Sequence, residues 1–263
     1  MFSFVFSTLI VFSCLVTTPR EIPDYKQLYD KYQVTGTFVL LNVNTGEKIS
    51  YNEKDNSTGY LPASTFKIIN SMIGLETGVI KNENHVIPWD KKERSNANWN
   101  SDTDLKTAYK NSTVWYYQEL ARRVGEKKMR YWVKTCDYGN RDIRGGIDRF
   151  WLNGNLRISP NQQVEFLVKL VSNKLPFSNS TTDLVKKIMI AEETPDYVLR
   201  AKTGWGFDGV TDIGWYVGYV TTKENTYVFA NCIQSTDQNQ KDFGKARIEI
   251  TREILKDQGI IKL

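Results

Sequence analysis

The chain has few of the side chains that most often build metal sites and charge-relay sites. Its 263 residues include one histidine, His85, and three cysteines, Cys14, Cys136 and Cys232. A zinc site made of cysteine and histidine would lack ligands. A serine–histidine–aspartate triad would rest on His85 alone, and we expect that residue to lie in a surface turn. We therefore predict no metal and no cofactor, and catalysis, if present, must use other bases.

Long apolar runs and clustered charge are also scarce. The net charge is only +5, from 35 basic and 30 acidic residues, and no basic run exceeds three residues. A nucleic-acid-binding surface would show more clustering, so we predict no nucleic-acid partner. With 40% hydrophobic and 13% aromatic residues, the composition is that of an ordinary globular protein. The length allows one large domain or two small ones.

The N-terminus is the exception to this pattern. Residues 1–19 are uncharged and largely apolar, and the first charge is Arg20. This length suits a signal peptide and is marginal for a membrane span, which needs about 20 apolar residues. We predict a signal peptide over 1–19, export to the periplasm, and no stable membrane insertion after cleavage. No basic residue precedes the run and no A-x-A follows it, so an uncleaved anchor or lipidation at Cys14 stays open. Export favours disulfides, but we expect Cys136 and Cys232 to be free and buried.

Strand patterns lie near both ends of the chain and helical patterns fill its middle. An early hairpin is predicted at 37–52, with Asn44-Thr45-Gly46 as its turn. After Pro195, strand patterns follow at 197–203, 212–222 and 226–234, before a last helix at 241–258. A parallel βαβ series would alternate instead. We predict an α+β fold in which both ends form an antiparallel sheet flanked by helices, with an all-helical subdomain inserted at about 62–193.

The middle segment carries recognisable helix boundaries. Apolar spacing predicts a helix over 64–77 with Gly78 as its stop, and a second over 113–124 that ends at Gly125. Ser159-Pro160-Asn161-Gln162 is a capping signature with proline at the first helical position.

Ser64-Thr65-Phe66-Lys67 is the first motif that could carry chemistry. At a helix start, Ser64 and Lys67 would lie one turn apart on the same face. A serine hydroxyl is a weak nucleophile unless a base lies beside it. Lysine becomes such a base when burial lowers its pKa. The helix N-terminus would also direct N–H groups at a developing oxyanion. A helix cap followed by a solvated lysine would have the same spacing.

Three further motifs follow in order along the chain. They are Ser112-Thr113-Val114, Tyr138-Gly139-Asn140 and Lys202-Thr203-Gly204. A lysine beside a hydroxyl can hold a carboxylate, and glycine lets a ligand approach the backbone. Individually the three could be a helix cap, a turn and a strand end. Their joint order after S-x-x-K is far more specific.

This set of motifs resembles the class D serine β-lactamases, the oxacillinase group. Serine β-lactamases and penicillin-binding proteins share S-x-x-K and K-T-G. The combination with STV, YGN and FWLNGNLRIS at 150–159 is similar to class D, over about Tyr60 to the C-terminus. The resemblance implies the serine β-lactamase and penicillin-binding transpeptidase-like fold, with 20–263 as one catalytic domain. It also implies a small-molecule β-lactam as partner, and it leaves the oligomeric state open.

The resemblance also implies a role for each matching residue. Ser64 would attack the β-lactam carbonyl and form an acyl-enzyme. Lys67 would be carboxylated by carbon dioxide to N6-carboxylysine and serve as general base for acylation and deacylation. Ser112 would relay protons to the leaving nitrogen. The backbone N–H groups of Ser64 and Trp205 would form the oxyanion hole.

Two groups of residues would support this chemistry. The substrate carboxylate would be bound by Lys202, Thr203, Gly204 and Arg247. The carbamate would be held by the indole of Trp151 and shielded by Val114 and Leu152, which could equally be ordinary core residues. Tyr117, one helical turn beyond Val114, could line the site.

Two alternatives remain at this level. A β-lactam sensor domain would acylate without turnover, although such a domain normally belongs to a larger chain with several spans. A small penicillin-binding protein would usually carry asparagine where this chain has Val114. We therefore predict hydrolysis of penicillins to penicilloates.

Overall fold

The computed structural model describes residues 24–237 and 239–262. The predicted signal peptide at 1–19 lies outside the described residues. The helices of the described chain are α1 (Lys26–Lys31), α2 (Lys67–Glu76), α3 (Leu105–Lys110), α4 (Val114–Val124), α5 (Glu126–Thr135), α6 (Pro160–Val171), α7 (Asn179–Ile188) and α8 (Phe243–Asp257). Its short 3₁₀ turns are η1 (Glu53–Asp55), η2 (Ala63–Phe66) and η3 (Ala97–Trp99). Its strands are β1 (Thr35–Asn42), β2 (Lys48–Tyr51), β3 (Val86–Ile87), β4 (Thr103–Asp104), β5 (Ile190–Glu193), β6 (Tyr197–Phe207), β7 (Asp212–Thr222) and β8 (Thr226–Ser235).

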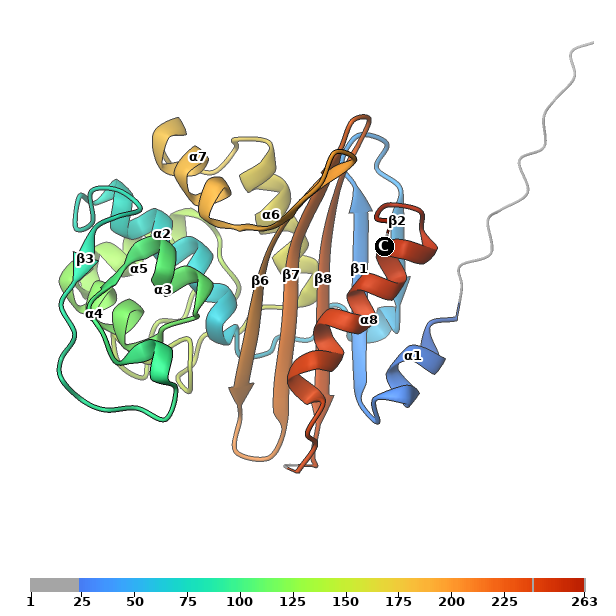
Figure 1. Ribbon diagram of the computed structural model, residues 1–263, viewed down its shortest axis with the longest axis horizontal. Helices are drawn as coiled ribbons and strands as arrows, with labels where there is room; N and C mark the ends of the chain where they lie inside the picture. Colours follow the sequence, from blue (N-terminus) through green and yellow to red (C-terminus); the bar gives the residue numbers. More distant parts are fainter. Residues whose placement is uncertain (1–23, 238, 263) are drawn as a thin grey trace, which may run out of the picture.

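A six-stranded antiparallel sheet organises the molecule. Its strand order is β2-β1-β8-β7-β6-β5, so β1 pairs with β8 and joins the two ends of the chain. Figure 1 shows this sheet standing between α1 and α8 on one side and the helices of the middle segment on the other. The predicted α+β fold, with its sheet built from both ends, is confirmed.

Alternation along the strands explains why both faces are covered. On β8, Val228, Ala230 and Cys232 pack into the core under the middle helices, whereas Phe229 and Ile233 pack under α8. Successive side chains of a strand point to opposite faces, so a strand with apolar residues at both parities needs two covering layers. The sheet is therefore the central layer between two cores.

The helical segment departs from the prediction at its far end. β5 lies at the edge of the sheet, within the range predicted to be helical. The strand was not predicted because Ile190-Ala191-Glu192-Glu193 has no strand-like alternation of apolar residues. The short pair β3 and β4 also falls within that range. The start of α6 is as predicted, because Ser159 and Gln162 form the capping box there.

Both described cysteines, Cys136 and Cys232, are free and buried, as predicted. Burial raises the pKa of the Cys136 thiol to about 12, so the thiol stays protonated. Within the described ranges, no helix is long and apolar enough to cross a membrane.

Candidate active site

Ser64 lies on the η2 turn, whose backbone is held by one hydrogen bond to a neighbouring segment and one within the turn. Ala63 has a left-handed φ of +47°, and its N–H donates to the carbonyl of Trp151 at 3.0 Å. The hydroxyl of Thr65 donates to the carbonyl of Pro62 at 2.7 Å. Such conformations persist only where surrounding contacts fix them. The turn therefore presents Ser64 in one orientation.

The helix start differs from the predicted one. We expected a helix over 64–77 beginning at Ser64, but α2 begins at Lys67 and the serine lies on a 3₁₀ turn before it. Side chains three residues apart eclipse one another in a 3₁₀ turn. The nitrogen Nζ of Lys67 consequently donates to Oγ of Ser64 at 2.7 Å. The structure brings the two residues of S-x-x-K into direct contact.

Lys67 is fully buried, and its environment disfavours the charged form. Burial lowers its pKa well below the usual value, and the positive charge of Lys202 lowers it further. Its Nζ lies 5.2 Å from the centre of the Tyr117 ring, so Tyr117 lines the site as the sequence suggested. Lys67 is thus an amine that can accept a proton beside a serine hydroxyl.

Trp151 supplies a buried donor that has no acceptor. Its ring is fully buried and stacks on Phe66 with 5.2 Å between ring centres. Its indole Nε1 has no hydrogen-bond partner among the described residues. A buried N–H without an acceptor costs about 1–3 kcal/mol, so such groups are rare unless a missing group satisfies them.

The two apolar residues predicted to shield Lys67 are only partly buried. Val114 begins α4 and Leu152 follows Trp151, and both are half-buried. Leu152 packs against the large core under the middle helices.

Ser112 and Lys202 meet across the site. Nζ of Lys202 donates to Oγ of Ser112 at 3.1 Å, although the residues come from a loop and from β6. Lys202 is buried over the ring of Tyr109, at 5.5 Å. Burial lowers its pKa to about 7, and the charge of Arg247 contributes. Sequence reasoning missed Tyr109, whose only signal is its position three residues before Ser112.

Ser112 is not the N-cap residue of a helix, which was the alternative interpretation of its motif. Thr113 is the N-cap residue of α4, and Ser112 has a left-handed φ of +53°. This turn directs the Ser112 hydroxyl towards β6 instead of towards the start of α4, as its hydrogen bond with Lys202 shows.

Arg247 reaches the same end of β6 from α8. Its Nη1 donates to the carbonyl of Gly204 at 2.6 Å, and its guanidinium lies 5.7 Å from the Trp205 ring centre. Its Nε is buried and has no hydrogen-bond partner in the described part of the chain, and burial lowers the pKa of the guanidinium to about 10. Thr203 is half-buried between Lys202 and Gly204. Two cations and a hydroxyl therefore gather where an anionic ligand could bind.

Gly204 allows β6 to pass close to the η2 turn. A side-chain carbon there would lie 3.1 Å from Cβ of Trp215 and 3.2 Å from the carbonyl oxygen of Pro62. Trp205, the next residue, is half-exposed, and its indole donates to Asp212 at 2.7 Å. β6 therefore carries the Lys202–Trp205 segment directly beside Ser64.

The remaining predicted residues have supporting positions. Gly139 has a left-handed φ of +56°, and a side-chain carbon there would lie within 2.1 Å of the Arg157 carbonyl oxygen. Asn140 donates its N–H to that same carbonyl at 2.8 Å, which seats the turn against the segment after Trp151. His85 lies in a turn, where its carbonyl accepts the Tyr116 hydroxyl. In the described part of the chain, no three acidic, histidine or cysteine side chains could hold a metal ion.

Comparisons with known proteins agree with this geometry. The family model described as the penicillin binding protein transpeptidase domain matches residues 36–256. Beta-lactamase OXA-48 of Klebsiella pneumoniae is 40% identical over 258 residues, which cover 98% of this chain and 96% of that protein. The crystal structure of the class D beta-lactamase YbXI from Nostoc is similar at a TM-score of 0.87 and 45% identity, covering 90% of this chain and 99% of that one. Regulatory protein BlaR1 of Bacillus licheniformis is 38% identical over 245 residues, which span 92% of this chain and 40% of that protein.

Proposed function

Because the chain belongs to the class D serine β-lactamases, hydrolases of the β-lactam amide bond, we propose that it opens the ring of penicillins through an acyl-enzyme on Ser64. One observation carries this proposal: a fully buried Lys67, with a lowered pKa, lies 2.7 Å from the Ser64 hydroxyl. That contact supplies the base that a serine nucleophile requires.

Acylation exchanges one bond for another at the β-lactam carbonyl. Lys67 takes the Ser64 proton as Oγ bonds to the carbonyl carbon, and the bond from that carbon to the ring nitrogen breaks. The ring nitrogen accepts a proton delivered through Ser112, which lies beside Lys202. The backbone N–H groups of Ser64 and Trp205 would stabilise the oxyanion. The product is an ester between Ser64 and the opened ring.

Deacylation returns the enzyme to its starting state. A water molecule gives a proton to the base at Lys67 and adds to the ester carbonyl carbon. The bond to Ser64 Oγ then breaks, Ser64 regains a proton, and penicilloate is released. Lys202, Thr203, Gly204 and Arg247 would hold the substrate carboxylate through both steps, since charge-assisted hydrogen bonds are the strongest available.

Lys67 has the setting that favours carboxylation on its side-chain nitrogen. Only a neutral amine reacts with carbon dioxide, and burial lowers the pKa of Lys67 and so favours its neutral form. Nε1 of Trp151, which has no partner among the described residues, would hold the added group, and Val114 and Leu152 would limit access of water. Carboxylation would supply an anionic base that can accept a proton in both half-reactions. No metal or other cofactor is required.

Turnover separates this proposal from a sensor role, which the similarity to BlaR1 raises. With a chromogenic cephalosporin in large excess, we expect continuous product release and no activity in Ser64→Ala. One equivalent of product followed by arrest would instead identify a sensor or penicillin-binding protein. An active Ser64→Ala protein would exclude the acyl-enzyme.

We further propose that the chain is exported, with residues 1–19 as its signal peptide and 20–263 as one catalytic domain. N-terminal sequencing of protein recovered from the periplasm should begin near Arg20. A retained Met1 would instead indicate an uncleaved anchor.

A further inference from the structure

The turn that carries Ser112 is held by hydrogen bonds on both sides of a left-handed residue. Ser112 donates its N–H to the carbonyl of Tyr109 at 3.2 Å, and Thr113 donates to the carbonyl of Ala108 at 2.9 Å. The φ of +53° at Ser112 is unusual for a residue other than glycine or asparagine and costs about 1–3 kcal/mol. Contacts from elsewhere must therefore keep this turn in place.

One such contact comes from a separate loop. The indole Nε1 of Trp99 donates to the carbonyl of Asn111 at 3.0 Å. That carbonyl belongs to the peptide bond leading into Ser112, so the contact fixes the plane from which the Ser112 side chain projects. Trp99 is itself tied to α4, because the indole of Trp115 donates to the Trp99 carbonyl at 2.7 Å.

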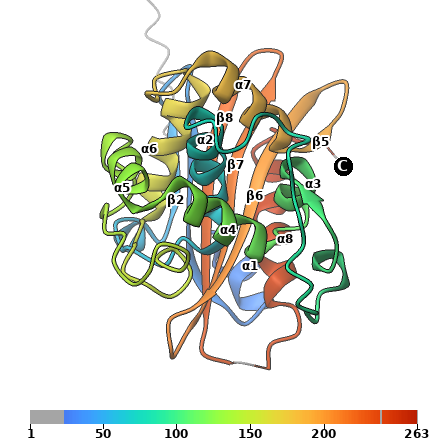
Figure 2. The ribbon, with the colours of Figure 1, turned by 90° about the vertical axis from the view of Figure 1, so that its left-hand side faces the viewer.

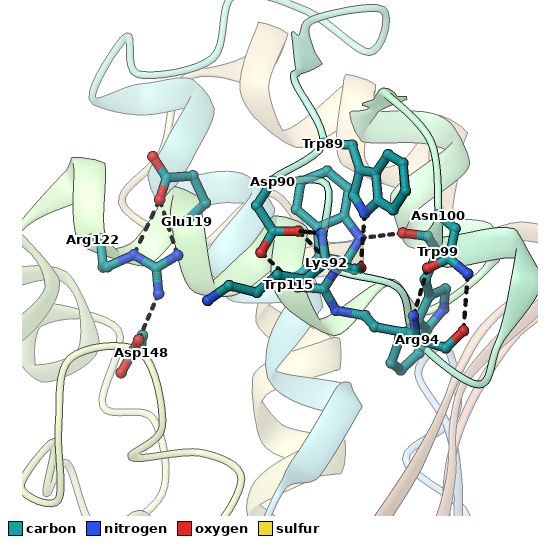
Figure 3. Close-up of polar contacts among 10 residues, drawn as sticks. All are labelled: Trp89, Asp90, Lys92, Arg94, Trp99, Asn100, Trp115, Glu119, Arg122 and Asp148. Carbon is teal, nitrogen blue, oxygen red and sulfur yellow. Dashed lines mark hydrogen bonds and ion pairs between the residues drawn. The ribbon is translucent and has the colours of Figure 1, made fainter.

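Arg94 organises the rest of that loop (Figure 3). Its guanidinium donates to both carboxylate oxygens of Asp90, at 2.9 and 2.8 Å, and to the carbonyl of Lys92 at 2.8 Å. The Asn100 side chain pairs with both the N–H and the carbonyl of Arg94, each at 2.9 Å. The guanidinium also lies over the Trp115 ring, 5.6 Å from its centre. The loop is thus closed on itself and clamped to α4.

We propose that the loop of residues 89–100 is a positioning strap for Ser112: Arg94 fixes the loop, and Trp99 fixes the peptide bond that aims the Ser112 hydroxyl at Lys202. Neither Arg94 nor Trp99 needs to touch the reacting atoms for this role. The proposal rests on the proposed function, in which Ser112 delivers a proton to the leaving nitrogen.

Loss of the strap would affect the chemical step more than substrate binding. The residues proposed to bind the carboxylate lie on β6 and α8. The hydrogen bonds of Arg94 and Trp99 described above go to neither element. Misplacing a catalytic group by about 1 Å can cost up to about 100-fold in rate. We expect the Ser112 hydroxyl to sample other orientations once its turn is released.

Stopped-flow acylation with a chromogenic cephalosporin tests the proposal. Trp99→Phe removes only the indole N–H, and Arg94→Ala removes the clamp. Each should lower the acylation rate constant by about tenfold or more, while the dissociation constant of the noncovalent complex changes less than about twofold. Arg94→Lys, which keeps the charge and one donor group, should recover part of the rate. The double variant should be no slower than the slower single variant, because both act through the same turn.

The controls distinguish positioning from general stability. Arg130→Ala breaks an Arg–Glu pair of the same kind, with Glu126 on α5, and should leave acylation unchanged. Circular dichroism confirms folding; if Arg94→Ala does not fold, Trp99→Phe decides alone. Wild-type acylation rates in folded Trp99→Phe would overturn the proposal, as would weaker binding with an unchanged rate constant. Acylation is measurable with or without turnover, so failure of the hydrolase proposal would appear separately, as a wild-type burst without steady state.

Discussion

Lys67 is buried, yet its side chain ends in a group that is normally charged in water. Two features bear on this conflict: burial lowers the pKa of Lys67 and favours the neutral amine, and the indole N–H of Trp151 has no acceptor among the described residues. A buried polar group without a partner is costly, so this indole N–H supports the proposal that Lys67 carries an added anionic group. The sequence could show Ser64 and Lys67 at the right spacing but could not show that this indole is unsatisfied.

Trp151→Phe tests whether the indole N–H of Trp151 holds an anionic group on Lys67. The phenyl ring keeps the stacking on Phe66 but removes the N–H, so carboxylation of Lys67 should be weakened. We expect kcat to fall by about tenfold in carbonate-free buffer, corresponding to about 1.4 kcal/mol, and to recover partly when bicarbonate is added. Carbon-13 NMR with labelled bicarbonate should show one carbamate signal in the wild type and a reduced one in the variant. An undiminished signal would assign Trp151 to packing alone.

Lys202 predicts a pH dependence whose sign follows from its lowered pKa. In the proposed mechanism the protonated form binds the substrate carboxylate; this form is present below a pKa of about 7 and lost above it. The kcat/KM of the free enzyme should therefore decline as the pH rises through about 7. Arg247→Ala should lower kcat/KM at pH 6 by roughly ten- to a hundredfold. It should also move the decline to higher pH, because the charge that lowers the pKa of Lys202 is gone. An unchanged pH profile would separate Arg247 from Lys202.

Among the elements, β6 and the η2 turn meet at the site. β6 carries the segment Lys202–Trp205, and Gly204 packs against the Ser64 turn. Figure 2 shows β6 beside β7 behind the helices that face the viewer, so the site lies at the junction of the sheet and the helical segment.

Gly204→Ala should separate these two elements. Its added carbon would lie 3.1–3.2 Å from atoms of Trp215, Pro62 and Thr65, closer than ordinary van der Waals contact, so these neighbours would have to move by a few tenths of an ångström. We expect the acylation rate to fall at least about tenfold. Gly78→Ala is the matched control, because Gly78 has a left-handed φ of +71° but open space around it. That variant should lose thermal stability and keep its acylation rate; equal rates in the two variants would contradict the crowding argument.

The capping box of α6 provides a stability prediction at the same scale. Ser159 accepts from the N–H of Gln162, and the Gln162 side chain accepts from the N–H of Ser159. Ser159→Ala should lower the free energy of unfolding by about 1 kcal/mol. Urea unfolding measures this change, and kcat should remain within twofold because the hydroxyl caps a helix and contacts no substrate-binding residue. A loss above about 3 kcal/mol would mean that the site includes more than a cap.

Across the whole molecule, the arrangement of the sheet followed from the sequence and several local conformations did not. The sequence predicted a sheet built from both ends of the chain. This prediction rested on strand patterns in the last part of the chain and on the helical patterns that separate them from the early hairpin. β5 was missed because Ile190–Glu193 carries no alternation, and its place is set by pairing with β6. The left-handed turn at Ser112 was also missed, because its conformation depends on Trp99, a contact that no local pattern reveals.

The site illustrates the same division. The motifs predicted which residues would lie together at the site, since the fold brings S-x-x-K at the η2 turn next to K-T-G on β6. Tyr109 under Lys202, and the donor of Trp151, arise from packing between distant segments. Tertiary contacts of this kind decide pKa values, so the chemistry becomes visible only once the chain is folded.

Mass spectrometry of the protein, intact and after proteolytic digestion, during a short penicillin pulse tests the central claim, that Lys67 serves as the base for the Ser64 acyl-enzyme in both half-reactions. In the wild type, an adduct on the peptide containing Ser64 should form and then disappear as penicilloate accumulates. In Lys67→Ala, any adduct that forms should form slowly and persist long after the substrate is removed. An adduct that leaves Lys67→Ala as fast as it leaves the wild type, or that maps to a peptide without Ser64, would contradict this account.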